Sequence, residues 1–273
     1  MKKILLAFDG THFSNGAFQF ARQLNELEPA LVTGAFLPQA QAANLWSYAD
    51  GMSGPMFVPL VEERDTEVIK ENMAKFEALC RKNGMDYRVH EDLYDFALPE
   101  LKAETRFADV LIIGSEVFYE NLGGKLNEYL QDILHRSECP VVVVPEKYDF
   151  PKTNILCYDG SESSVYAIKQ FAYLFPELTK HPTLMVYVHE DGKNEFPQQV
   201  NIEELVARHF SDLTLMKLDM SPEKYFSTWM NNRESALVVS GAFGRSAISQ
   251  LIRRSLVKDV IAEHKLPVFI AHR

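Results

Sequence analysis

The sequence contains one pattern twice, and this duplication limits the folds open to the chain more than any other feature. Residues 154–161 repeat the apolar run and Asp-Gly turn of residues 4–11 at an offset of 150, and residues 266–270 repeat residues 139–143 at an offset of 127. The two offsets differ by 23 residues, close to the length of a Pro- and Gly-containing insertion at 38–62. Such internal similarity indicates two copies of one structural unit.

Each copy alternates short apolar runs, typical of buried parallel strands, with amphipathic stretches typical of helices. Over 273 residues this alternation predicts an α/β chain of two tandem, doubly wound, five-stranded parallel-sheet domains of Rossmann-like type. We expect the domains at 1–146 and 153–273, with a linker at 147–152. The expected strands are 4–8, 31–37, 86–90, 110–113, 140–145, 154–158, 184–188, 213–218, 236–240 and 266–270. The expected helices are a stretch from 14 that Pro29 ends, then 63–82, 98–105, 125–136, 164–174, 202–209, 223–232 and 247–263.

Charge and cysteine spacing argue against several functions. The formal net charge of −10 disfavours nucleic acid as a partner, because phosphate backbones are bound by basic faces. Cys80, Cys139 and Cys157 stand far apart and match neither a disulfide framework nor a zinc site. No apolar run approaches the roughly 20 residues that span a bilayer, and the apolar run at the N-terminus is too short for a secretory signal. We therefore expect a cytoplasmic protein without a membrane partner.

The insertion at 38–62 interrupts the alternation. It combines Pro38, Pro55 and Pro59 with several large apolar side chains, among them Trp46 and Phe57, so the sequence predicts a long loop. One interpretation is a loop packed on its own side chains. The other is a lid or a docking surface for a protein partner.

The candidate site lies at two strand-to-helix turns of the second copy. Asp159, Gly160 and Ser161 follow the first strand of that copy, and Gly241 and Gly244 follow the fourth. If the strand order reverses between these two strands, both turns face one crevice, where backbone N–H groups and a helix N-terminus favour an anion. The alternative is structural: glycines make tight turns, and Asp159 and Ser161 are residue types that cap helices.

These turns resemble the duplicated, tandem-domain universal stress proteins, and the resemblance extends over essentially the whole chain. Nucleotide-binding members of that family carry an Asp after the first strand and a Gly-x-x-Gly, nine residues, Gly-Ser/Thr signature after the fourth. Gly241 and Gly244 match the first pair, but Arg254 precedes Ser255 where the signature has glycine. The resemblance implies an adenine nucleotide alpha hydrolase-like fold that binds ATP or another adenine nucleotide, with Mg²⁺ accompanying it.

The resemblance also implies where each part of the nucleotide lies. The base is expected near Val188, the ribose near Asp159 and the phosphates over Gly241, Gly244 and Ser255. Arg254 either adds a cation for the phosphates or fills the space that glycine leaves for them, and the alternative is a solvated surface arginine. The cofactor-binding residues expected here are Asp159, Gly160, Ser161, Val188, Gly241, Gly244, Arg245, Arg254 and Ser255.

The first copy departs further from the signature. Gly114 ends its fourth strand, but the second glycine is missing at the required spacing, and Asn127 and Glu128 stand where the Gly-Ser pair is expected. A carboxylate at that position repels an anion. We therefore expect one degenerate copy and one nucleotide site per chain.

The sequence shows no catalytic constellation, because His12, His189 and His209 have no partners that make a triad or metal set, and the phosphate loop with its lysine is absent. We expect a universal stress protein-like regulatory or stress-response protein without dedicated catalysis. The alternatives are a slow ATP hydrolase in the same crevice and a nucleotide-free protein-interaction module. The apolar fifth strands would leave exposed edges if each copy stood alone. In the family the equivalent strands pair two domains, so the resemblance implies that the two copies pair inside the chain as a pseudo-dimer. A further homodimer between chains is compatible with this pairing.

Overall fold

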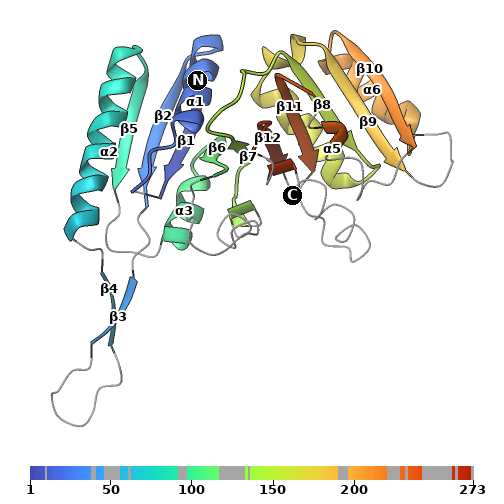
Figure 1. Cartoon of the computed structure of the whole chain (residues 1–273). Coiled ribbons are helices and arrows are strands. Elements are labelled where there is room, and N and C mark those ends of the chain that lie inside the picture. Colours follow the sequence, from blue (N-terminus) through green and yellow to red (C-terminus); the bar gives the residue numbers. More distant parts are fainter. Residues whose placement is uncertain are drawn as a thin grey trace.

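The computed structural model describes residues 1–9, 11–37, 41–45, 56–60, 63–91, 97–116, 133–134, 136–189, 196–219, 228–230, 233–241, 260–261 and 264–271. Ten strands of the described part form a single sheet (Figure 1). The strands of the first half are β1 (Lys2–Phe8), β2 (Ala30–Phe36), β5 (Asp86–Glu91), β6 (Val110–Gly114) and β7 (Val141–Val144). The strands of the second half are β8 (Thr153–Tyr158), β9 (Thr183–His189), β10 (Leu213–Asp219), β11 (Ala236–Gly241) and β12 (Val268–Ala271).

Both halves have the same strand order. The first half runs β7-β6-β1-β2-β5 and the second runs β12-β11-β8-β9-β10, with parallel pairing inside each half. In each half the order therefore reverses between the first strand and the fourth. This confirms the doubly wound parallel fold, and it places a topological switch point, where ligands bind in such sheets, beside β8 and β11.

The two halves join through their fifth strands. β7 and β12 pair antiparallel, with Val142 opposite Phe269, and both of these side chains are fully buried. The prediction that the fifth strands pair inside the chain is confirmed. The pairing removes two apolar edges that would otherwise invite association.

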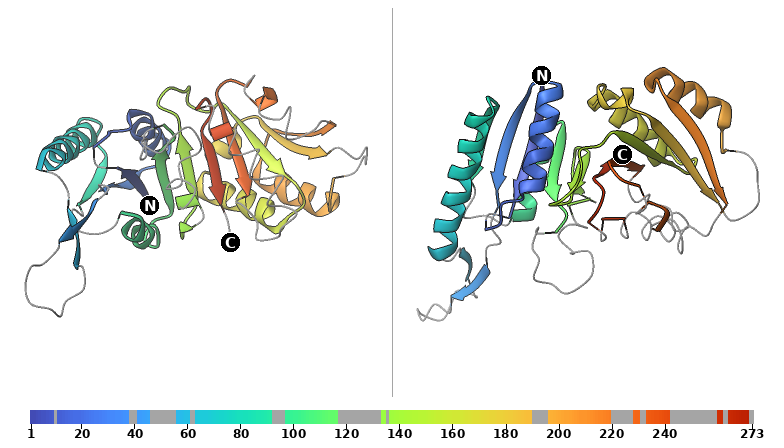
Figure 2. Two further views of the ribbon diagram at one scale, coloured as in Figure 1. Left: turned by 60° about the horizontal axis from the view of Figure 1, so that its bottom comes forward. Right: turned by 45° about the horizontal axis from the view of Figure 1, so that its top comes forward.

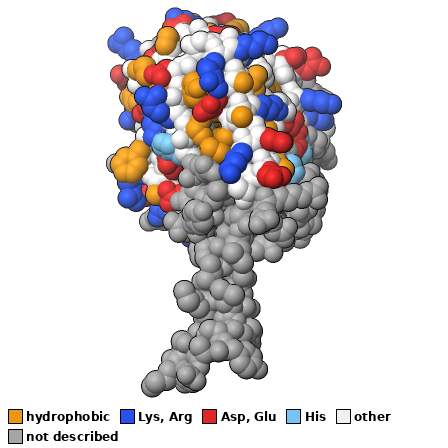
Figure 3. Space-filling view, turned by 90° about the vertical axis from the view of Figure 1, so that its left-hand side faces the viewer, with side chains coloured by type: hydrophobic (Ala, Val, Ile, Leu, Met, Phe, Trp, Pro, Cys, Tyr) orange, Lys and Arg blue, Asp and Glu red, His pale blue; other side chains and the backbone are white. Residues whose placement is uncertain are grey.

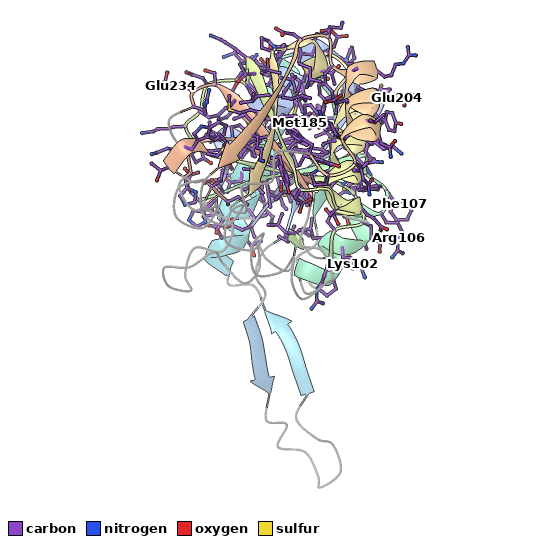
Figure 4. All side chains as sticks on the ribbon, turned by 90° about the vertical axis from the view of Figure 1, so that its right-hand side faces the viewer. Lys102, Arg106, Phe107, Met185, Glu204 and Glu234 are labelled. Atoms are coloured by element: carbon purple, nitrogen blue, oxygen red, sulfur yellow. The ribbon has the colours of Figure 1, made fainter. Side chains whose placement is uncertain are left out.

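Helices cover both faces of the sheet (Figure 2). The helices α1 (Asn15–Leu27), α2 (Glu63–Lys82), α5 (Glu162–Leu174) and α6 (Gln199–His209) contribute to one apolar core, which runs through both halves. The helix α3 (Ala97–Thr105) contributes Leu101 to a second core on the opposite face. Figure 4 shows Met185 inside the first of these cores and Glu204 on the outer side of α6. The expected helices at 125–136, 223–232 and 247–263 lie mostly outside the described residues.

The alternating apolar pattern explains why β1 is central. Ile4, Leu6 and Phe8 point into one core and Leu5 and Ala7 into the other, and all five are at most 2% exposed. A strand buried on both faces needs apolar residues at every position. β1 and the equivalent strand β8 therefore run through the core, and their carboxyl ends lie at the switch points of the two halves.

The insertion differs from the sequence prediction. Residues Gln41–Leu45 (β3) and Met56–Leu60 (β4) pair antiparallel, with Ala42 opposite Pro59, so the prediction of a loop was wrong over these ten positions. Pro59 is tolerated because a two-stranded ribbon consists of edge strands, where one missing N–H donor breaks no interior ladder. The hairpin projects away from the sheet (Figures 1 and 4). The rest of the insertion lies outside the described residues.

On the face of the first half drawn in Figure 3, acidic and basic side chains are interspersed. Within the described ranges, no helix is long and apolar enough to cross a membrane.

Candidate functional site

The switch point of the second half brings four of the predicted residues close together. Asp159, Gly160 and Ser161 connect β8 to α5, and Gly241 is the last residue of the neighbouring strand β11. A Cβ atom added at Gly241 would lie 2.5 Å from the carbonyl carbon of Ser163 in the first turn of α5. Glycine is therefore required at 241 by the close packing of strand against helix. Any ligand role for it is additional.

The Asp159 turn is ordered by its own hydrogen bonds. The backbone N–H and the hydroxyl of Ser161 both donate to Asp159 Oδ1, at 3.1 and 2.7 Å. Ser161 is the N-cap of α5, and its Oγ accepts the backbone N–H of Ser164 at 3.2 Å. Ser161 therefore caps α5, which is the structural role given above as the alternative to ligand binding. This arrangement leaves the Asp159 carboxylate exposed at the carboxyl end of β8, beside the switch point.

Gly160 also has a structural reason to be glycine. Its φ angle is +79°, a left-handed conformation that other residues adopt at a cost. A Cβ atom there would lie 2.6 Å from Pro197 Cβ. The turn is therefore covered on one side by residue 197, which the sequence did not predict.

The other predicted residues are placed in part or not at all. Val188 lies in β9, where it pairs with Leu218 of β10, and its side chain is not described. Gly244, Arg245, Arg254 and Ser255 lie outside the described residues. Their roles as ligand contacts stay predictions.

In the corresponding turn of the first half, the aspartate is buried. Asp9 follows β1 as Asp159 follows β8, but it is only 6% exposed. Its Oδ1 accepts the backbone N–H of His12 at 2.7 Å, and its Oδ2 lies 3.0 Å from His12 Nδ1. Both halves cap the following helix with serine, Ser14 or Ser161, but three more residues separate Asp9 from its cap. The longer loop turns this carboxylate inward.

The N-terminus of α1 is occupied by a carboxylate from the same chain. Glu146 Oε2 accepts the backbone N–H groups of Asn15 and Gly16, each at 3.1 Å. The backbone N–H of Glu146 in turn donates to Glu116 Oε2 at 2.6 Å. A carboxylate at a helix N-terminus satisfies the same donors that would bind a phosphate. The sequence carries no local signal for this contact, because its partners are 130 residues apart.

Cys157 lies in β8, the strand that ends at the Asp159 turn. Burial raises the pKa of Cys157, in β8, to about 12, so it stays protonated. Among the residues with described side chains, no group of His, Cys, Asp and Glu could hold a metal ion. The geometry offers an exposed carboxylate, a capped helix N-terminus and a tight strand end, which together suit binding of a polar ligand and supply no catalytic base–nucleophile pair.

Comparison with known proteins shows the class of fold. No protein-family model matches the sequence, and no curated protein is significantly similar to it. A universal stress protein from Archaeoglobus fulgidus matches the whole chain and 96% of its own length, with a TM-score of 0.67 at 15% identity. A protein of unknown function from Pseudomonas aeruginosa matches with a TM-score of 0.59 at 12% identity over 92% of its length.

A second Pseudomonas aeruginosa protein, provisionally assigned to the universal stress proteins, matches with a TM-score of 0.55 at 10% identity over 93% of its length. All three similarities cover 100% of the present chain. The chain therefore has the tandem α/β fold seen in a full-length universal stress protein. At these identities the likeness establishes the fold, and the function has to be argued from the site.

Proposed function

We propose that this chain is a regulatory protein of the universal stress class that binds one adenine nucleotide, ATP or a relative of it, in its second half without dedicated catalysis. The observation that carries the proposal is the exposed carboxylate of Asp159 at the switch point between β8 and β11. A carboxylate only accepts hydrogen bonds, so it suits the paired hydroxyl donors of a ribose.

The remaining contacts of the proposed site follow from its place in the sheet. We assign the phosphates to the loop after β11 and the base to the end of β9, near Val188. Mg²⁺ would accompany a triphosphate. The domain limits 1–146 and 153–273 and a cytoplasmic location are part of the same proposal. The residues assigned to the phosphates are Gly241, Gly244, Arg245, Arg254 and Ser255.

The first half is proposed not to bind nucleotide. Two observations support this: Asp9 is buried against His12, and Glu146 already occupies the N-terminus of α1. A ligand would have to displace two sets of internal hydrogen bonds there.

The projecting hairpin β3–β4 supports a second role, the docking of a protein partner. A two-stranded ribbon is only marginally stable by itself, and partners commonly add a strand to such edges. Replacing residues 41–60 with a short Gly-Ser turn should abolish partner capture and leave nucleotide affinity unchanged.

Titration calorimetry of the full chain with ATP, ADP and AMP tests the main proposal. We expect one nucleotide per chain, and an affinity at least about 10-fold lower for Asp159→Ala, since two charge-assisted hydrogen bonds are lost. Asp212→Ala, an exposed carboxylate before β10, is the matched control and should bind like the unmodified chain. Two equivalent sites, or an affinity that ignores Asp159, would contradict the proposal. Phosphate release that Asp159→Ala abolishes would instead indicate the slow hydrolase.

A further inference from the structure

Residues 196–198, which we call the strap, pass over the carboxyl end of β8. They follow the end of β9 and lead into α6, and they lie over the turn between β8 and α5. Pro197 approaches Gly160 so closely that a Cβ atom on this glycine would lie 2.6 Å from Pro197 Cβ and 3.0 Å from its Cγ. The strap therefore rests directly beside Asp159.

Among the described residues, side chains of β8 and β9 and the adjoining core contact the strap. The hydroxyl of Tyr158, the last residue of β8, donates to the carbonyl oxygen of Pro197 at 2.7 Å. The ring of Phe196 packs on that of Tyr187 in β9, with centroids 5.6 Å apart and planes tilted by 38°. The Tyr158 side chain is almost fully buried, and the pKa of its hydroxyl is raised by burial and by the nearby Tyr187, so it remains a proton donor. The strap thus bridges the ends of β8 and β9.

The backbone at the end of the strap is under strain. Gln198 has φ 50° and ψ 42°, a left-handed conformation that is costly for a residue other than glycine, asparagine or aspartate. Gln198 is also the N-cap of α6, yet its side chain makes no capping hydrogen bond. By contrast, Ser14 and Ser161 cap α1 and α5 from extended conformations. Because the junction between the strap and α6 is strained and uncapped, we expect the strap to have a second position in which the Gln198 backbone is relaxed.

We propose that the strap is a lid on the nucleotide site, closed in this structure and latched by the Tyr158 hydroxyl, and that it must lift before a nucleoside can lie between Asp159 and the end of β9. This inference rests on the proposed function for the identity of the ligand. The backbone supports a lid over a fixed wall, because the left-handed conformation of Gln198 opposes the contacts that hold the strap down. Opening of the lid then sets the rate of nucleotide association.

If the Tyr158 hydroxyl latches the lid, a conservative substitution of Tyr158 should change the rate of nucleotide association. Tyr158→Phe keeps the buried ring and removes the hydroxyl, so the open population should rise about 3- to 10-fold, the range expected for one hydrogen bond. Stopped-flow mixing with the N-methylanthraniloyl derivative of ATP should show the association rate rising by the same factor. Tyr173→Phe is the matched control, because the Tyr173 side chain is 55% exposed and lies in α5, and it should change nothing. An association rate that is unchanged or lower in Tyr158→Phe would overturn the lid.

Hydrogen exchange tests the lid proposal independently of nucleotide binding. In the absence of nucleotide, the backbone amides of residues 196, 198 and 199 should exchange faster in Tyr158→Phe than in the unmodified chain. Phe196→Ala, which removes the contact with Tyr187 from a half-buried position, should have the same effect by an independent route. Faster exchange in both variants supports the lid even if no nucleotide binds. Unchanged exchange in both overturns it even if nucleotide binding is confirmed.

Discussion

The Asp9 turn and the Asp159 turn begin alike and end differently. Each follows the first strand of its half and leads to a serine-capped helix. The second turn is short and leaves its carboxylate exposed, whereas the first is three residues longer and buries Asp9 against His12. The strand order is the same in both halves, whereas the two turns differ in length and in the exposure of their aspartates. Loop length thus changes where the side chain points even when the fold is repeated.

Glu146 adds to this contrast. It supplies the α1 N-terminus with an internal anion, whereas the α5 N-terminus has an acidic residue, Glu162, in its own exposed first turn. In the first half, therefore, backbone N–H groups at the N-terminus of α1 are paired with the carboxylate of Glu146. Four comparisons between the two halves can break or sharpen this contrast.

The largest difference is expected between the glycines at the ends of the fourth strands. A Cβ atom at Gly241 would meet the backbone of Ser163 and Ser164 at 2.5 to 2.6 Å, whereas one at Gly114 would meet the Ser14 hydroxyl at 2.7 Å. Gly241→Ala should lower the free energy of unfolding by about 3 kcal/mol, because backbone has to move. Gly114→Ala should cost about 1 kcal/mol, because the serine rotates and only the cap is lost. Urea denaturation measures both, and equal losses would contradict the rigid packing at Gly241.

The next difference is expected between the two aspartates. Asp9→Ala removes a buried carboxylate and leaves the backbone N–H of His12 without its acceptor in a partly buried turn, which should cost about 2 kcal/mol of unfolding free energy. Asp159→Ala removes an exposed carboxylate and should cost about 0.5 kcal/mol. Thermal unfolding of the two variants compares them directly. A larger loss at Asp159 would mean that its turn, and not that of Asp9, is the structural one.

A smaller difference is expected between the helix N-termini. Glu146→Gln keeps the shape of the side chain but removes the charge that faces the N–H groups of Asn15 and Gly16, which should cost about 1 kcal/mol of unfolding free energy. Glu162→Gln, at an exposed position in the first turn of α5, should cost about 0.3 kcal/mol. The same denaturation experiment in high salt should reduce the second loss more than the first, because an exposed charge is screened more strongly. Equal losses would remove the special role of Glu146.

The smallest effect is expected for the two thiols, Cys80 and Cys157, which should behave alike. Burial raises the pKa of Cys80 in the first half and of Cys157 in the second to about 12, from 9.0. The folded state therefore holds these protons more tightly, so this contribution to stability is complete below pH 9 and falls as the pH rises toward 12. At pH 8 neither thiol should react with an aromatic disulfide reagent until the chain is unfolded. Fast labelling of one thiol in the native protein would show that its half opens locally.

Much of the architecture was predictable because it depends on local periodicity. The helix expected at 63–82 is observed as α2, Glu63–Lys82, and the strand expected at 4–8 is observed as β1, Lys2–Phe8. The hairpin in the insertion was missed because prolines and glycines indicate loops, while an isolated ribbon tolerates Pro59. Glu146, Tyr158 and Pro197 were missed because their partners are distant in sequence.

By itself the sequence determined the duplication, the alternation of strands and helices, and the positions of the turns that follow the first and fourth strands. These depend on which residues are apolar and at what spacing, so they can be read from neighbours in the chain. Only the tertiary structure decided that β7 and β12 pair antiparallel with Val142 opposite Phe269, that Asp9 turns inward while Asp159 stays exposed, and that Pro197 lies over Gly160. These depend on distances between segments that fold together from far apart, and residue spacing alone does not contain them.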